Sequence, residues 1–169
     1  YYNKQVRRDR STIIHYDPYF YPLDSIGSWN RVYGRKGFLQ YKFVVPFDGG
    51  KDIMRSFLKK TSERGMLSFL SILKTLGNES GGLLSFPKPG YTLALDIPLK
   101  NKNIIEFLSG LTKEITRGGG RIYLAKDAII SKDDFNYMYP KFKDFKRIKE
   151  ACDPHKRLRS LQSDRLGIT

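Results

Sequence analysis

A lysine stands near the end of an otherwise apolar strand pattern in residues 120–127, Gly-Arg-Ile-Tyr-Leu-Ala-Lys-Asp. Strand alternation would place Lys126 on the same face as Ile122 and Leu124. In one interpretation its ammonium group simply reaches solvent beyond the strand, as most lysines do. In the other it points at an anion or an electron-rich ring, where a fixed cation stabilises negative charge. The elements around it must decide between the two.

Further polar side chains fall on one face of two other predicted strands. In residues 37–45, one face is apolar and the other carries Gln40 and Lys42. In residues 91–97, the apolar face alternates with a small and polar one formed by Thr92, Ala94 and Asp96. If the apolar faces are covered, the opposite face displays Gln40, Lys42, Thr92, Ala94 and Lys126 to a ligand or to another domain.

The predicted elements follow the order strand, helix, strand, strand, helix, strand. Helices are expected at 51–64 and at 103–117, where Asn103 and Glu106 have capping-box spacing. Residues 66–76 are apolar on both faces and predict a buried strand, although periodicity alone does not exclude a helix. We therefore expect an α+β domain with a ferredoxin-like antiparallel sheet and helices on one face.

The remaining segments give weaker patterns. A short helix is expected at 24–33, and a glycine-rich loop at 77–90 around a short strand at 83–86. A helical stretch capped by Ser131 and Asp134 should be interrupted at Pro140. Cys152 recurs at helical spacing with Phe142 and Phe145, which predicts core packing rather than a nucleophile. We divide the chain into a connecting arm, an α+β domain and a basic tail, at 1–23, 24–152 and 153–169.

Composition favours an anionic partner. The 169 residues include 31 Lys and Arg against 17 Asp and Glu, a net charge of +14. This charge suits nucleic acid, a phosphorylated cofactor or lipid, a membrane surface or an acidic domain, and does not choose among them. A single cysteine excludes an internal disulfide, and His15 has no second ligand at metal spacing, so no metal is expected.

One interpretation is an RNA-recognition module, which shares this element order and a basic charge. The stretch Lys-Gly-Phe-Leu-Gln-Tyr-Lys-Phe at 36–43 resembles the main strand signature of such modules. However, that signature requires a small residue at Leu39, an aromatic at Gln40 and an aliphatic at Tyr41. It also belongs on the third strand rather than the first. We therefore do not expect nucleic acid as the partner, and keep an RNA-recognition module as the alternative.

A second interpretation comes from an ordered set of motifs. They are Phe20-Tyr21-Pro22-Leu23-Asp24, Trp29-Asn30-Arg31-Val32-Tyr33-Gly34, Gly37-Phe38-Leu39-Gln40-Tyr41, Pro89-Gly90-Tyr91-Thr92-Leu93-Ala94-Leu95-Asp96, the 120–127 stretch, Met138-Tyr139-Pro140 and Asp153-Pro154. Together they resemble the C-terminal half of FAD-dependent oxidoreductases of the vanillyl-alcohol-oxidase type. Within that family they are most similar to oxidases of polyprenylphosphoryl pentoses. The resemblance spans nearly the whole chain.

This resemblance implies a cap domain that roofs the flavin ring with its antiparallel sheet. Lys126 matches the active-site lysine of the family and Gln40 a glutamine of the substrate pocket, so both would also contact the cofactor, FAD. Tyr21, Lys42, Thr92 and Ala94 would line the substrate, the 2′-hydroxyl of a polyprenylphosphoryl ribose that is oxidised to a ketone. Lys42 departs from the glutamine common there. Thr92 stands where mycobacterial enzymes have asparagine, and Ala94 where they have a cysteine attacked by covalent inhibitors, so no adduct is expected at Ala94.

The resemblance also implies partners that these residues lack. No phosphate-cradling glycine loop is present, since residues 118–120 act only as a helix stop. The FAD-binding domain is therefore expected elsewhere on the same polypeptide, which agrees with a first residue of Tyr1 rather than Met. A reductase subunit that completes epimerisation and a cytoplasmic location at the membrane surface are further expectations. No apolar run approaches the roughly 20 residues of a membrane span.

Overall fold

The computed structural model describes residues 13–21, 27–66, 68–99 and 103–169, which form two units, Tyr1–Arg35 and Lys36–Thr169. The first unit contains helix α2 (Tyr16–Phe20) and the 3-10 helix η1 (Trp29–Tyr33). Part of the helix predicted at 24–33 lies outside the described residues. Its described part is η1, which ends at Gly34 with a positive φ of 76°.

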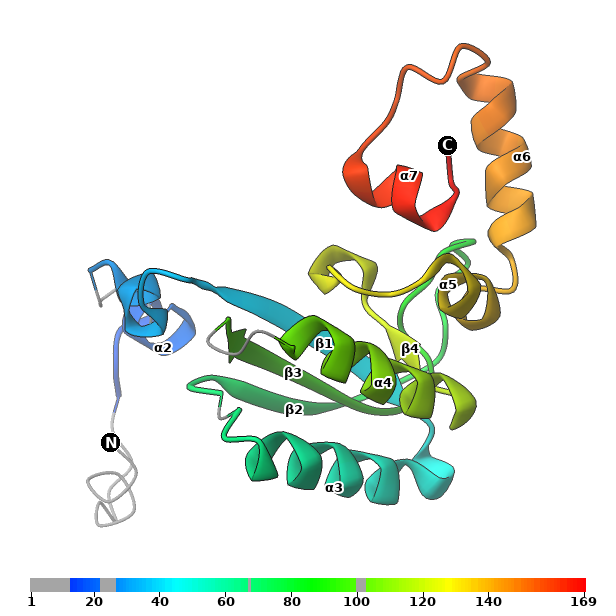
Figure 1. Ribbon diagram of the computed structural model, residues 1–169. Helices are drawn as coiled ribbons and strands as arrows, with labels where there is room; N and C mark the ends of the chain where they lie inside the picture. The colour runs from blue at the N-terminus through cyan, green and yellow to red at the C-terminus, as the bar shows by residue number, and fades with distance from the viewer. Residues whose placement is uncertain (1–12, 22–26, 67, 100–102) are drawn as a thin grey trace. The chain divides into compact units, whose positions relative to one another are not determined.

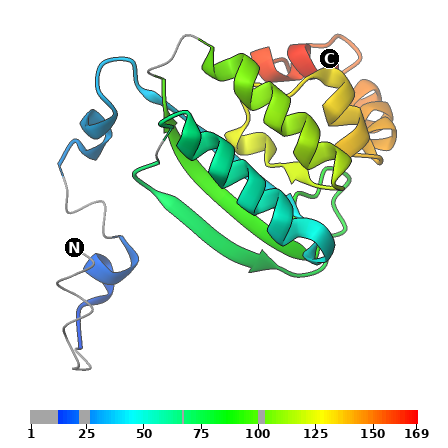
Figure 2. The same cartoon turned by 60° about the horizontal axis from the view of Figure 1, so that its bottom comes forward.

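The second unit is built on a four-stranded antiparallel sheet in the order β2-β3-β1-β4 (Figure 1). The strands are β1 (Phe38–Val45), β2 (Ser71–Leu76), β3 (Gly90–Pro98) and β4 (Arg121–Ile122). Helix α3 (Phe47–Glu63) connects β1 to β2, and helix α4 (Ile104–Arg117) connects β3 to β4. Both helices cover the same face of the sheet (Figures 1 and 2). The predicted α+β, ferredoxin-like arrangement is confirmed.

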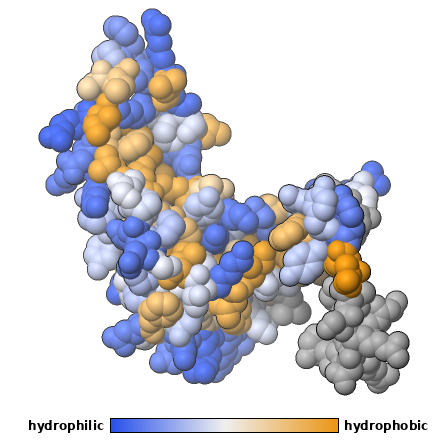
Figure 3. Space-filling model, turned by 180° about the vertical axis from the view of Figure 1, so that it is seen from behind, coloured by the Kyte–Doolittle hydropathy of each residue, from blue (hydrophilic) through white to orange (hydrophobic). Residues whose placement is uncertain are grey.

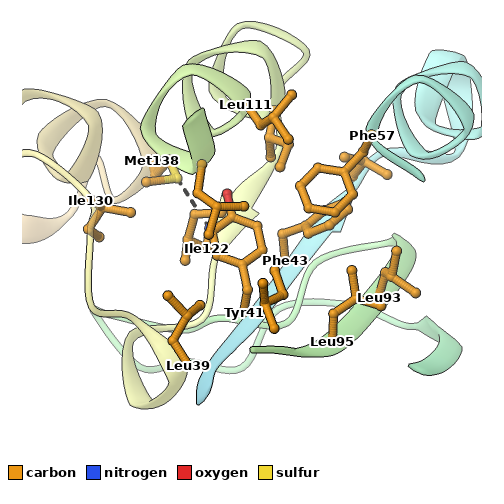
Figure 4. Packing of buried hydrophobic residues seen from close by; sticks show 14 of the residues in the cluster. Leu39, Tyr41, Phe43, Phe57, Leu93, Leu95, Leu111, Ile122, Ile130 and Met138 are labelled. Carbon is orange, nitrogen blue, oxygen red and sulfur yellow. Dashed lines mark hydrogen bonds between the residues drawn. The ribbon is translucent and has the colours of Figure 1, made fainter. Parts of the chain in front are cut away.

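The core lies between this sheet face and the two helices, as the alternation in β1 predicts. Leu39, Tyr41 and Phe43 are buried there, and the Tyr41 ring stacks on Phe57 of α3 with centroids 5.6 Å apart (Figure 4). The Tyr41 hydroxyl lies 2.7 Å from the Thr112 hydroxyl of α4. Because Thr112 donates its own proton to a carbonyl one turn earlier, Tyr41 must be the donor. Burial raises the pKa of Tyr41 far above its usual range.

The strand predicted at 120–127 is much shorter than the alternation suggested. Pairing with β1 covers Arg121 and Ile122, after which the chain turns into the 3-10 helix η2 (Leu124–Lys126). The buried Tyr139 hydroxyl donates to the Ile122 carbonyl at 2.6 Å. The Tyr139 hydroxyl thus satisfies the Ile122 carbonyl at the point where the pairing of β4 with β1 ends. Lys126 is therefore presented by a helical turn rather than by a strand.

Two other strand predictions need correction. Residues 66–76 were expected to form a buried strand, but β2 begins at Ser71 and is largely exposed, because it is the outermost strand of the sheet. Residues 83–86 form no strand. Instead, Ser85 and Phe86 are buried in a loop whose Ser85 carbonyl accepts a hydrogen bond from the Arg121 guanidinium at 2.5 Å.

Of two helix caps predicted from the sequence, one forms and the other does not. Ser131 accepts from the Asp134 N–H at the start of α5 (Lys132–Met138), as predicted. Asn103 precedes α4, but its side chain makes no capping hydrogen bond there. The amphipathic stripe of α4, rather than its cap, therefore fixes the helix against the sheet.

The C-terminal segment is folded over the end of the sheet domain. Helix α6 (Phe142–Cys152) buries Phe142 in its first turn, so its far end projects and Cys152 is exposed. The predicted core position of Cys152 is therefore wrong. The residues expected to form a basic tail include helix α7 (Leu161–Leu166), whose Leu166 is fully buried.

Candidate functional site

The sheet face opposite α3 and α4 carries the predicted site residues in a defined register. Gln40 lies opposite Asp96, and Lys42 opposite Ala94. The Gln40 amide nitrogen donates to the buried Asp96 carboxylate at 3.0 Å, which fixes the orientation of the Gln40 amide. The molecule seen from behind Figure 1 mixes hydrophobic and hydrophilic side chains (Figure 3). We refer to the sheet face that carries Gln40, Lys42, Thr92, Ala94 and Asp96 as the open face.

Lys42 lies against two aromatic rings on the open face. Its Nζ is 4.9 Å from the centroid of Tyr123 and 5.2 Å from that of Phe86, and the two rings lie 4.7 Å apart. Phe86 comes from the loop before β3 and Tyr123 from the residue after β4. The loop and the shortened strand together hold the lysine beside two ring faces, a favourable position for a cation.

Lys126 and Lys74 complete a cluster of three cations with Lys42. Burial, and then the like charges of Lys126 and Lys74, lower the pKa of Lys42. The strand register places Lys74 opposite Thr92, hence on the same face as Lys42. Among the described residues, neither Lys42 nor Lys126 forms an ion pair with a carboxylate. The three-lysine cluster therefore gives the open face a local positive potential that suits an anion.

The other predicted residues, Ala94, Thr92 and Tyr21, have three different surroundings. Ala94 is half-buried between Lys42 and Ile72, where its small side chain leaves room above the sheet. Thr92 is buried and donates its hydroxyl proton to the Phe43 carbonyl at 2.8 Å, so this proton serves the backbone. Tyr21 belongs to the first unit and is exposed there. Contact of these side chains with a substrate stays a prediction.

The segment carrying Lys126 is held by Asp127, whose side chain is fully buried. Its carboxylate accepts from the N–H groups of Ile129 and Ile130, both at 2.9 Å, and pairs with Arg165 of α7 at 2.7 Å. These bonds fix the backbone next to Lys126. Helix α7 thus positions the lysine segment, although it is distant in the sequence.

Sequence reasoning missed Lys74, Phe86 and Tyr123. The lysine alternates with Ile72 and Leu76, a signal that becomes usable only once β2 is known to be an edge strand beside β3. The two rings come from segments whose strand predictions were wrong, so nothing in their local pattern placed them beside Lys42.

Comparison with known proteins gives a relative that covers most of the chain. Over 145 residues, 86% of this chain, it is 37% identical to the decaprenylphosphoryl-β-D-ribose oxidase of Mycolicibacterium smegmatis. The chain is a distant homologue of the C-terminal part of that oxidase. An uncharacterised protein in the mprA 5′ region of Streptomyces coelicolor is 31% identical over 133 residues, 79% of this chain. No protein-family model matches.

The match is to a part of each relative. This chain spans 31% of the oxidase and 36% of the Streptomyces protein. In the described ranges, no helix has the length and apolar character needed to cross a membrane. The side chains of β3 on the open face are Thr92, Ala94 and Asp96, none of them aromatic, whereas RNA-recognition sheets stack bases on aromatic side chains of their strands.

Proposed function

We propose that this chain is the substrate-side cap of an FAD-dependent oxidoreductase that oxidises a sugar hydroxyl to a ketone. The proposed substrate is the 2′-hydroxyl of a polyprenylphosphoryl ribose. The observation that carries the proposal is the coincidence of the three-lysine cluster on the open face with homology to a ribose oxidase. The FAD-binding domain would be supplied by the same polypeptide.

The open face fits a flavin in its chemistry. Lys42 and Lys126 are half-buried cations without carboxylate partners among the described residues, and Ala94 beside them is small. When bound, FAD would accept a hydride at its N5 atom from the substrate carbon. The residues proposed to hold it are Lys126 and Gln40.

Each side chain would have a separate task. Lys126 would stabilise negative charge, either on the reduced cofactor or on the substrate oxygen. Gln40, oriented by Asp96, would present its amide to the substrate hydroxyl groups. Lys42 would act as a second cation, and its two ring neighbours would limit the access of water to it.

The proposal also includes a location in the cell and a partner enzyme. A polyprenyl-phosphate substrate is anchored in a bilayer, so we place the enzyme in the cytoplasm at the membrane surface. Because oxidation alone gives a ketone, a reductase subunit would complete an epimerisation. The net charge of +14 is consistent with both an anionic substrate and an anionic surface.

Substitution of Lys126 tests this assignment. In the full-length protein, Lys126→Met should lower kcat by about 10²- to 10³-fold, because it removes a preorganised cation from the reacting centre. Thermal stability should be unchanged, since the Lys126 side chain forms no ion pair within the described structure. Because Lys126 is also a proposed cofactor contact, kcat is expressed per bound flavin. Lys143→Met, on the exposed side of α6, is the matched control and should keep full activity. Equal activity of the two variants would remove Lys126 from the mechanism.

A further inference from the structure

Within the unit Lys36–Thr169, no described strand pairs with the outer edge of β2. β2 is the end strand of the sheet, and within the described residues its pairing partner is β3 alone. The Asp96 N–H donates to the Leu70 carbonyl at 3.3 Å. Since antiparallel pairs alternate between bonded and non-bonded positions, the backbone groups of Ile72 and Lys74 face β3, whereas those of Leu73 and Thr75 face outward. A further chain could therefore pair with these outward groups.

A groove runs beside this edge, between β2 and α3. It measures about 630 Å³ and is lined by Lys51, Met54, Arg55, Leu58, Lys59, Leu73 and Tyr91. Its floor is apolar and partly exposed, since Leu58 is 44% and Leu73 63% exposed. Figure 2 shows α3 lying over the sheet with β2 running along its outer side. The groove lies in the position where the side chains of an added strand would enter.

The charged groups of the groove are all cationic. Lys51, Arg55 and Lys59 lie on one face of α3, at spacings of four residues, and Lys51 is also 5.8 Å from the centroid of the Tyr91 ring. Asp52 and Glu63 pair with Arg55 and Lys59 but do not line the groove. Lys51 forms no ion pair within the described residues, so the groove keeps a net positive charge, and Lys74 adds a cation on the opposite face of β2. An added strand with acidic side chains on the Lys74 face would therefore be attracted from both sides.

We propose that β2 and this groove bind an extended, acidic segment of a partner protein, with apolar side chains at alternate positions. The segment adds a strand to β2 by pairing with the outward groups of Leu73 and Thr75. Its apolar side chains enter the floor between Leu58 and Leu73, and its acidic side chains on the other face of the added strand meet Lys74.

Two other occupants fit the groove less well. A second copy of the chain, paired through β2, would bring the cationic rims of two α3 helices toward each other. A bilayer favours apolar side chains that protrude, whereas this floor is recessed between a helix and a strand. The groove lies on the helix side of the sheet, so the proposal does not require the oxidase function, although Lys74 belongs both to this binding surface and to the three-lysine cluster.

A binding experiment on the full chain tests the proposal. The probe is a fluorescein-labelled peptide of alternating glutamate and valine, about eight residues long to match a strand. Its anisotropy should rise on titration with the chain, and a peptide of alternating lysine and valine should not bind. Hydrogen exchange of the Leu73 and Thr75 amides should slow in the complex.

Two variants and a control distinguish binding at the β2 edge and its groove from non-specific attraction to a basic protein. Thr75→Pro removes an outward N–H and should weaken binding at least about tenfold. Lys51→Glu with Arg55→Glu should do the same, while Lys113→Glu with Arg117→Glu on the exposed face of α4 makes the same charge change and should not. The proposal is overturned if the acidic peptide does not bind, or if the α4 control loses binding equally. It is also overturned if the chain dimerises through this edge without peptide, or if phosphatidylglycerol vesicles, and not the peptide, occupy the groove.

Discussion

Lys42 shows how neighbouring charges set the chemistry of one amine. Burial and the like charges of Lys126 and Lys74 lower its pKa, while the rings of Tyr123 and Phe86 favour its protonated form. A lowered pKa leaves more of the amine neutral at any given pH, and the neutral amine is the form that reacts with acylating reagents.

We therefore predict that Lys42 is acylated at lower pH than the exposed Lys143. Peptide mass spectrometry after brief acetylation across a pH series would give the midpoint for each lysine. Partial burial slows the reaction of Lys42 at every pH but does not move its midpoint. Lys126→Met removes one like charge, so it should shift the Lys42 midpoint upward. Identical midpoints for Lys42 and Lys143 would contradict the described cluster.

At this scale the sequence predicted which side chains share a face, but not their neighbours. Alternation in β1 and β3 correctly placed Gln40, Lys42 and Ala94 opposite the core, because the side-chain period of a strand is fixed. Lys74 was missed because cross-strand register depends on long-range pairing, which no local pattern contains.

At the scale of elements, helix α7 stabilises the segment that presents Lys126. Leu166 of α7 is fully buried in the main core, and Arg165 pairs with the buried Asp127 next to Lys126. A segment that the composition indicated to be a basic tail thus contributes to the folded domain. The charges of Arg157, Arg159 and Arg165 dominate the local composition and conceal the single buried leucine.

Truncation of that leucine should destabilise the whole unit. Leu166→Ala should lower the free energy of unfolding by about 2 to 5 kcal/mol, the range for a fully buried leucine. Leu161→Ala lies on the same helix at 91% exposure and should change stability by at most about 0.5 kcal/mol. Urea denaturation followed by circular dichroism measures both. If the two variants unfold alike, α7 does not belong to the core.

The element order was predictable, whereas several boundaries were not. Strong alternation and two amphipathic helices are sufficient for the ferredoxin-like order. The early end of β4 depends on a hydrogen bond from Tyr139, 17 positions away, and the exposure of Cys152 depends on where α6 leaves the core. Both features depend on tertiary contacts, which helical or strand periodicity does not predict.

For the whole molecule, the central claim is that the open face packs on a flavin and that its side chains take part in the reaction there. Two features of the described unit support it: a positively charged sheet face with small and amide side chains, and homology to the C-terminal part of a ribose oxidase. Because the chain spans 31% of that relative, catalysis would require the remainder of a longer protein. The 169-residue chain alone is therefore not expected to turn over substrate.

The most direct test is a visible absorption spectrum of the purified full-length gene product, recorded without oxygen before and after addition of a polyprenylphosphoryl ribose. The account predicts a flavin band that bleaches on addition of the substrate, because the hydride taken from the 2′ carbon reduces the cofactor. A polyprenylphosphoryl sugar without a 2′-hydroxyl group should leave the band unchanged. A full-length protein without a flavin band, or with a band that the ribose substrate does not bleach, would contradict the account.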